Sequence, residues 1–223
     1  MRKEVDMLEM IENCHKDNFI VNQFISPGYF LGKVDVEVLN IIKTEIDSIQ
    51  KKSDDKIKWN NNLAGQIKKE FYLSESIIKV EGYFVQIAKQ FYEYNYYGRP
   101  MGEMKLIDLW VNFQQKNEYN PPHNHQGVVS FVIWINIPYL IEDEIKLINS
   151  DQTTNPCAAK FAFIYTTADG TITSENLPVD KRYEGVICIF PSTVNHMVYP
   201  FKSSDGYRIS VSGNIGFKAN YTS

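Results

Sequence analysis

The sequence has few cysteines and no close cysteine pair. Its three cysteines, Cys14, Cys157 and Cys188, are widely separated in a chain of 223 residues. Because zinc and redox motifs need two cysteines a few residues apart, we expect three reduced structural thiols. Cys188 stands in an apolar run, where burial raises the pKa of a thiol and suppresses the reactive thiolate. A cysteine nucleophile is therefore not expected.

Long apolar runs and runs of positive charge are also missing. No apolar stretch reaches the ~18 residues of a membrane span, and Met1–Met7 carries charges where a signal peptide needs an apolar segment. The net charge is −4 without a long Lys/Arg run, so a nucleic-acid partner is not favoured. We expect a cytoplasmic protein with no membrane partner.

Internal repeats, low-complexity tracts and Pro/Gly/Ser-rich linkers are absent too, which favours a single domain over residues 1–223. The first hundred residues carry helical patterns. Apolar residues recur every three or four positions between Asp35 and Gln50, and again from Ser76 until Gly98-Arg-Pro stops the pattern. We expect these two helices to pack on a sheet as a flank, residues 1–100, with a solvated loop at 51–56.

From residue 105 onward the period becomes that of β-strands. The runs are short, rich in β-branched and aromatic residues, and separated by Pro, Gly, Asn and Asp. The predicted strands are Leu106–Gln114, Gly127–Ile137, Lys160–Thr167, Gly185–Phe190, His196–Tyr199 and Tyr207–Ile215. Short strands joined by turns predict a mainly β protein with flanking α-helices, whose core at 105–217 is a sandwich or jelly roll.

Three of the four histidines lie in this β-rich half: His123, His125 and His196. Residues two apart in an extended segment share a face, so His123 and His125 can present both imidazoles to one ion. A third ligand from another strand, His196, completes one face of an octahedron and leaves open positions, as non-haem Fe(II) oxygenases need. His15 has no spacing that relates it to this set and is predicted to be structural.

Twelve residues after His196, Arg208, Ser210 and Ser212 alternate onto one strand face. A guanidinium and a hydroxyl two residues apart can bind a carboxylate, because the Arg fork matches two oxygens and the serine adds a donor. The alternative is a surface arginine on an amphipathic edge strand.

Together, His-x-His at 123–125, His196 and Arg208-x-Ser210 resemble the 2-oxoglutarate/Fe(II) oxygenase superfamily, whose core is a double-stranded β-helix of cupin-like form. A closer likeness is to a branch frequent in tailed phages and marine bacteria. It is seen in Pro122-His-Asn-His-Gln-Gly-Val-Val-Ser-Phe131, in Phe190-Pro-Ser192, in Arg208-Ile-Ser-Val-Ser-Gly-Asn-Ile215 and in an upstream Asn62-Leu-Ala-Gly65. The likeness covers residues 105 to 217.

This resemblance implies a dioxygenase that uses Fe(II), 2-oxoglutarate and O₂, releases succinate and CO₂, and hydroxylates its substrate. It implies His123, His125 and His196 as metal ligands and Arg208 with Ser210 as the site for the far carboxylate of 2-oxoglutarate. Asn112, Gln114 or Ser130 could contact the co-substrate or the second shell of the metal, or could be polar positions on half-buried strands. If the gene belongs to a phage, the protein would act in the host cytoplasm.

The sequence departs from the superfamily at His125, where most members have Asp or Glu. Three arrangements stay open. The first has three histidine ligands and is favoured because both side chains fall on one face; the second has two ligands, His123 or His125 with His196; the third has a carboxylate supplied from elsewhere. The competing functions are a cupin-type three-histidine enzyme that does not use 2-oxoglutarate, and a non-catalytic jelly-roll binding or structural phage protein. The substrate, whether a protein side chain or a small molecule, and the oligomeric state are not determined by the sequence.

Overall fold

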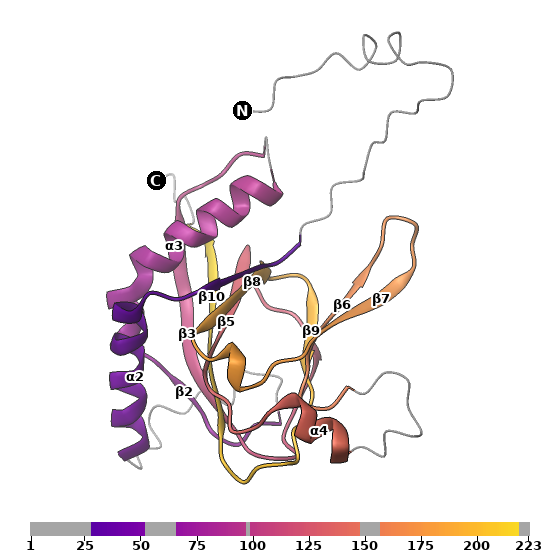
Figure 1. Cartoon of the computed structure of the whole chain (residues 1–223). Helices are drawn as coiled ribbons and strands as arrows, with labels where there is room; N and C mark the ends of the chain where they lie inside the picture. Colours follow the sequence, from indigo (N-terminus) through magenta and orange to yellow (C-terminus); the bar gives the residue numbers. More distant parts are fainter. Residues whose placement is uncertain (1–27, 52–65, 97–98, 148–156, 219–223) are drawn as a thin grey trace.

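The computed structural model describes residues 28–51, 66–96, 99–147 and 157–218 (Figure 1). Its larger sheet has six antiparallel strands in the order β1-β8-β5-β10-β3-β2. These strands are β1 (Phe30–Lys33), β2 (Glu70–Tyr72), β3 (Met104–Gln114), β5 (Val129–Asn136), β8 (Val186–Pro191) and β10 (Arg208–Phe217). The smaller sheet has the order β4-β9-β6-β7 and contains β4 (Asn120–His123), β6 (Phe161–Thr166), β7 (Ile172–Leu177) and β9 (Asn195–Val198).

Helices cover one face of the larger sheet. They are α2 (Val36–Lys51) and α3 (Ser76–Asn95), and Figure 1 shows both on the side of β3 away from the smaller sheet. The start of α3 is stabilised by α2, because the Glu45 carboxylate accepts hydrogen bonds from the backbone N–H groups of Glu75 (3.1 Å) and Ser76 (2.6 Å). The predicted pair of helices packed on the sheet is thus confirmed.

Successive side chains of each central strand point to opposite faces of the larger sheet, so the apolar ones form two separate cores. On β10, Ile209, Val211 and Ile215 join the cluster that contains Phe84 and Phe91 of α3. On β5 and β8, side chains such as Val132 and Phe190 face the smaller sheet and pack against its residues. The residues of β3 and β10 between the apolar ones therefore face the space between the two sheets, where the candidate site lies.

All six predicted strands are found, with shifts of one or two residues at their ends, and the fold class is confirmed as mainly β with flanking helices. The sequence did not predict β1, β2, β4, β7 or the short helix α4 (Ile141–Leu147). These elements are short, and β4 contains two prolines, so neither period is visible in them. Most of the predicted loop at 51–56, and Asn62–Gly65, lie outside the described residues, as do Cys14 and His15.

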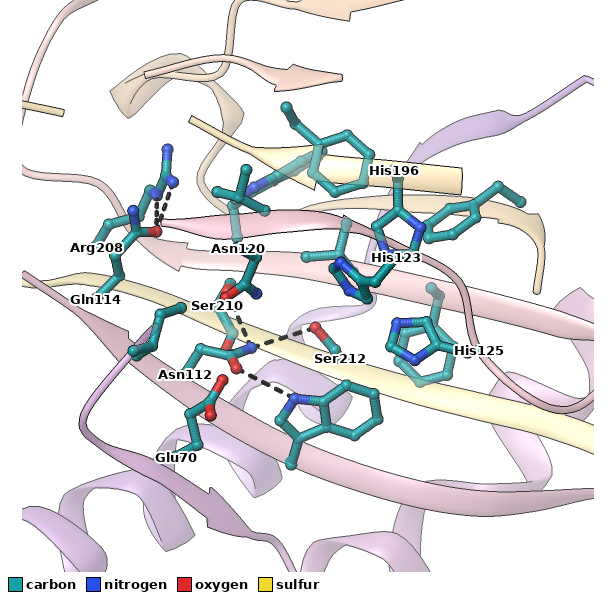
Figure 2. Close-up of a pocket in the computed structure, with 18 residues that line it drawn as sticks. Glu70, Asn112, Gln114, Asn120, His123, His125, His196, Arg208, Ser210 and Ser212 are labelled. Carbon is teal, nitrogen blue, oxygen red and sulfur yellow. Dashed lines mark hydrogen bonds between the residues drawn. The ribbon is translucent and has the colours of Figure 1, made fainter. Parts of the chain in front are cut away.

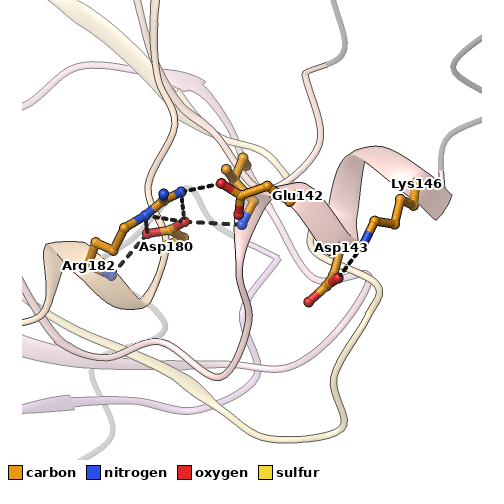
Figure 3. Close-up of polar contacts among 6 residues, drawn as sticks. Glu142, Asp143, Lys146, Asp180 and Arg182 are labelled. Carbon is orange, nitrogen blue, oxygen red and sulfur yellow. Dashed lines mark hydrogen bonds and ion pairs between the residues drawn. The ribbon is translucent and has the colours of Figure 1, made fainter.

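A polar network fixes the segment between β5 and α4 (Figure 3). The buried Asp180 precedes the 3-10 helix η4 (Lys181–Tyr183) and accepts hydrogen bonds from Arg182 and from the backbone N–H of Ile141 at 3.1 Å. Burial alone would raise the pKa of Asp180, but these hydrogen bonds lower it on balance, so the carboxylate is ionised at neutral pH. The network holds in place the loop that carries Tyr139. Within the described residues, no helix is both long and apolar enough for a membrane span.

Candidate metal and co-substrate site

The three histidines converge at one end of a cavity between the two sheets (Figure 2). His123 of β4 is the register partner of His196 of β9, and their ring centroids lie 4.3 Å apart. His125 is 5.0 Å from each of them by the same measure. One candidate ligand atom from each imidazole lies within 4.8 Å of the others. The structure therefore brings together all three predicted ligands.

His125 lies just beyond the strand that carries His123. Both histidines were expected on one extended segment, and β4 ends at His123. His125 follows in an irregular segment, where its backbone N–H donates to the Ser192 carbonyl at 2.9 Å. Gly127 then turns the chain into β5 with φ +112°, a conformation that favours glycine. The expected convergence of His123 and His125 is thus found, with only His123 inside a regular strand.

Hydrogen bonds orient two of the rings. His123 Nδ1 lies 2.7 Å from the Pro121 carbonyl, and His196 Nδ1 lies 3.1 Å from the Val194 carbonyl. Because a carbonyl only accepts, each neutral ring carries its proton on Nδ1 and leaves the Nε2 lone pair for a metal. Backbone carbonyls orient metal-binding histidines in this way in many proteins.

Burial keeps the three rings neutral. It lowers the pKa of His123, and together with the neighbouring imidazoles it lowers the pKa of His125 to about 4 and that of His196 to about 3. Phe161 and Phe190 pack on His196 with ring centroids 5.6 and 4.8 Å away. Neutral imidazoles in an apolar surrounding are competent ligands for a transition metal, so this end of the cavity fits an iron ion.

Arg208 lies at the opposite end of the same cavity (Figure 2). Its side chain is buried, and its guanidinium donates to Gln114 Oε1, Tyr139 Oη and the carbonyls of Ala159 and Tyr199. All of these acceptors are neutral, and within the described part of the chain no carboxylate forms an ion pair with Arg208. A buried guanidinium surrounded by neutral groups favours an anionic ligand.

Between the two ends lies a polar wall built around Asn112. Its Oδ1 accepts from Trp110 Nε1 at 3.1 Å, and its Nδ2 lies 3.4 Å from Ser210 Oγ and 3.3 Å from Ser212 Oγ. Arg208, Ser210 and Ser212 of β10 thus face the cavity together, as expected. Asn112 and Ser210 line the space between the histidines and Arg208, where their predicted contact with the co-substrate stays a prediction.

Ser130 has a different location from the other predicted site residues. It is not among the residues that line the cavity, and its hydroxyl lies 2.8 Å from both Ser192 Oγ and Asn214 Oδ1. Because the Ser192 carbonyl accepts from His125, Ser130 holds the turn that positions this histidine. Its place supports a positioning role and offers no direct contact for a co-substrate.

Sequence reasoning missed several lining or anchoring residues, including Tyr139, Glu70 and Asn120. Tyr139 stands in a loop after β5, and only the tertiary fold brings its hydroxyl to Arg208. Glu70 is a buried carboxyl on the three-residue β2, and burial raises its pKa to about 7, with a further contribution from Glu118. A charged residue in a short strand gave no periodic signal.

A wider groove adjoins the histidine end of the cavity. It has a volume of about 620 Å³ and shares Phe190 with the narrow cavity. Tyr29 and Phe163 line it and stack with ring centroids 5.0 Å apart, while the Tyr29 hydroxyl donates to Glu175. The hairpin of β6 and β7, which extends from the body in Figure 1, forms one side of this groove.

Comparisons with known proteins agree with this geometry. Residues 108–214 match the family described as "Putative 2OG-Fe(II) oxygenase". No curated protein matches the sequence. The match begins in β3 and ends in β10, so it includes the three histidines and Arg208.

Solved structures share the fold at low sequence identity. A Pseudomonas putida prolyl-4-hydroxylase has 13% identity and a TM-score of 0.52 over 87% of this chain and 95% of its own. The α-ketoglutarate-dependent epimerase SnoN of nogalamycin biosynthesis has 12% identity and a TM-score of 0.55 over 86% and 77%. A Trichoplax adhaerens prolyl hydroxylase has 10% identity and a TM-score of 0.52 over 85% and 83%. These likenesses confirm the double-stranded β-helix fold. The family match supports a non-haem Fe(II) and 2-oxoglutarate-dependent oxygenase.

Proposed function

We propose that His123, His125 and His196 bind Fe(II) and that Arg208 binds the far carboxylate of 2-oxoglutarate. The observation that carries this proposal is the buried guanidinium with only neutral acceptors, placed in the same cavity as three convergent neutral imidazoles. A dicarboxylate that reaches from the histidines to Arg208 would supply the missing negative charge. A cupin-type enzyme without 2-oxoglutarate would have no use for this cation.

Bound iron, 2-oxoglutarate and O₂ would supply the oxidising chemistry, with succinate and CO₂ as products and a hydroxylated substrate. The chain's own residues position the reactants. The three imidazoles would hold one face of the ion, Arg208 would fix the far end of the co-substrate, and the aromatic rings around His196 would exclude water. Asn112 and Ser210 would direct their polar atoms toward the middle of the co-substrate.

A three-histidine site would leave the iron one charge more positive than a site with two histidines and a carboxylate. Among the described residues that line the cavity, Glu70 is the only acidic one. It lies beside Asn112, its register partner on β3. We therefore keep His125 as the third ligand.

The substrate is proposed at the level of class. The structural relatives include prolyl hydroxylases, one of them in complex with a peptide fragment, and an epimerase from nogalamycin biosynthesis. We propose a peptide or small-molecule substrate that reaches the iron along the groove that Phe190 shares with the cavity. The chain would act as one domain over residues 1–223. The narrower likeness to the phage and marine bacterial branch, and the cytoplasmic location, stay predictions.

The proposal is tested by loading the protein with Fe(II) and measuring succinate formed from 2-oxoglutarate, with candidate substrate pools examined for a gain in mass. We expect succinate to form, with or without hydroxylation of a substrate. Its formation should require all three histidines and Arg208. The matched control is Arg99→Lys, a change at an exposed arginine stacked on Tyr96. Iron binding without any 2-oxoglutarate binding would favour the cupin alternative.

A further inference from the structure

We propose that Gln114 is a neutral stand-in for the carboxylate of the co-substrate: its amide oxygen occupies the fork of Arg208 and must leave before 2-oxoglutarate can bind. This inference rests on the proposed function, because it takes Arg208 as the carboxylate site. It adds a residue that competes with the co-substrate and so sets its affinity.

The first observation is the shape of the contact. Gln114 Oε1 accepts from Arg208 Nε at 2.9 Å and also from Nη2, so one oxygen receives both N–H groups on the same edge of the guanidinium (Figure 2). That edge is the one on which an arginine holds a carboxylate through two parallel hydrogen bonds. The amide oxygen thus lies where a carboxylate would bind.

The second observation is that the other acceptors of Arg208 are fixed. Two are main-chain carbonyls, of Ala159 at 2.9 Å from Nη1 and of Tyr199 at 3.1 Å from Nη2. The third is the hydroxyl of Tyr139, whose ring is buried and stacks on Phe201 with centroids 5.0 Å apart. These three hold the guanidinium in place. Only the Gln114 side chain can leave without a change in the backbone or the core.

The third observation concerns space and charge. The cavity between the histidines and Arg208 has only about 50 Å³ open to water-sized molecules, which is room for a few waters at most. A five-carbon dicarboxylate needs volume that a side chain now fills. Exchange of an amide oxygen for a carboxylate also gives the guanidinium an acceptor of opposite charge, with two oxygens for two parallel hydrogen bonds.

The position of Gln114 allows this exchange. It is the last residue of β3 and the register partner of Arg208 on β10, so its side chain can rotate at the end of a strand. Its Nε2 donates to the carbonyl of Glu118 in the turn that follows, at 2.5 Å. This second bond gives the amide a place to remain after its oxygen has released Arg208.

The test compares Gln114→Ala and Gln114→Glu with Gln115→Ala in the full-length protein loaded with Fe(II) without oxygen. Gln115 is the matched control, because it is the adjacent glutamine and its amide donates to the exposed Tyr207 hydroxyl. The dissociation constant of 2-oxoglutarate is measured by calorimetry or by tryptophan fluorescence, since Trp110 and Trp134 line the cavity. Iron affinity and the melting temperature are measured for each variant.

We expect Gln114→Ala to bind 2-oxoglutarate about 3- to 10-fold more tightly than the wild type, the value of roughly one hydrogen bond that no longer competes. We expect Gln114→Glu to lose at least about 30-fold in affinity, because its own carboxylate would hold the fork of Arg208. Both variants should keep the iron affinity of the wild type, and Gln115→Ala should match the wild type throughout.

Weaker or unchanged 2-oxoglutarate binding in Gln114→Ala would overturn the inference and make Gln114 a support for Arg208. Wild-type affinity in Gln114→Glu would overturn it too, and this variant decides the matter if the alanine variant does not fold. The proposed function fails separately: in that case the iron-loaded wild type would not bind 2-oxoglutarate, or Arg208→Lys would bind it as well as the wild type.

Discussion

The two ends of the cavity differ in how ready they are for their ligands. At the histidine end, three neutral rings face one another, and hydrogen bonds to carbonyls orient two of them for metal binding. At the Arg208 end, the guanidinium is already hydrogen-bonded to four protein groups. An ion can bind at the first end without breaking the hydrogen bonds that orient these rings. A carboxylate can bind at the second only by exchange.

The difference follows from charge. Neutral imidazoles can be buried with unused lone pairs at moderate cost, whereas a buried guanidinium without hydrogen-bond acceptors would be very unfavourable. The fold therefore supplies acceptors to Arg208 but keeps them neutral, so that an anion still gains by replacing one. This difference can be tested by changes that affect both ends of the cavity, one end alone, or the polar wall between them.

The largest effect should come from removing the helices that pack on the larger sheet, because both ends of the cavity depend on that sheet. A chain that begins at Glu103 lacks α2 and α3 and exposes the face of the larger sheet that contacts Phe84 and Phe91. We expect it to aggregate or to lose cooperative thermal unfolding, because an extended apolar surface is exposed. Circular dichroism and light scattering check this. A soluble fragment that melts cooperatively and binds iron would show that the helices are a separable domain.

Next in size is the loss of a metal ligand. His125→Ala should lower Fe(II) affinity by at least about 100-fold, since removal of a ligand costs more than loss of a second-shell partner. The fold should survive, because His125 lies in an irregular segment after β4. Anaerobic iron titration measures the effect, and His15→Ala serves as the histidine control. Full iron affinity and turnover in His125→Ala would mean that only His123 and His196 bind the metal.

A change at the Arg208 end should lower the affinity for 2-oxoglutarate and leave the affinity for iron unchanged. Arg208→Lys should weaken 2-oxoglutarate binding by about 2–4 kcal/mol, or roughly 30- to 1000-fold, because an ammonium cannot present two parallel donors. Iron affinity should stay close to that of the wild type. Calorimetry of both ligands on one preparation checks the pair of expectations. A parallel loss of iron affinity would show that the two ends are not independent.

The smallest effect concerns Glu70 in the wall and depends on pH. Its folded pKa is raised to about 7 by burial, so the folded state keeps a proton between pH 4.5 and 7 that the unfolded chain has lost. This contribution to stability is complete below about pH 4.5 and is lost as the pH rises through 7. Raising the pH from 5 to 8 should therefore lower the free energy of unfolding by about 1–3 kcal/mol through this group.

Glu70→Gln should remove that part of the pH dependence, and Glu37→Gln, an exposed change on α2, should not. Urea unfolding at pH 5 and pH 8 measures it. Ionised Glu70 would also repel a bound dicarboxylate, so 2-oxoglutarate affinity should fall above pH 7 in the wild type and less in Glu70→Gln. Equal pH profiles for the wild type and the variant would show that Glu70 does not titrate in this range.

Much of the fold could be predicted because residues of different kinds alternate along its central strands. One face of these strands packs on the helices, and the other faces the cavity and the smaller sheet. The period of two in β3 and β10 identified which side chains face the cavity, and the period of the helices identified the face that covers the sheet. The edge strands β1, β2, β4 and β7 could not be found in this way, because an edge strand needs only part of this pattern. Their positions depend on pairing with a partner strand.

The sequence by itself predicted the proposed ligand set, because the histidine spacing and Arg208-x-Ser210 identify side chains whose chemistry suits a metal and a carboxylate. Only the tertiary structure decided how each is held. It placed Ser130 behind the His125 turn, brought Tyr139 to Arg208 across 69 positions of sequence, and set Gln114 opposite Arg208 through the register of β3 and β10. The physical reason is that side-chain chemistry and local period are written in neighbouring residues. Register, burial and hydrogen-bond partners arise from contacts between residues far apart in the chain.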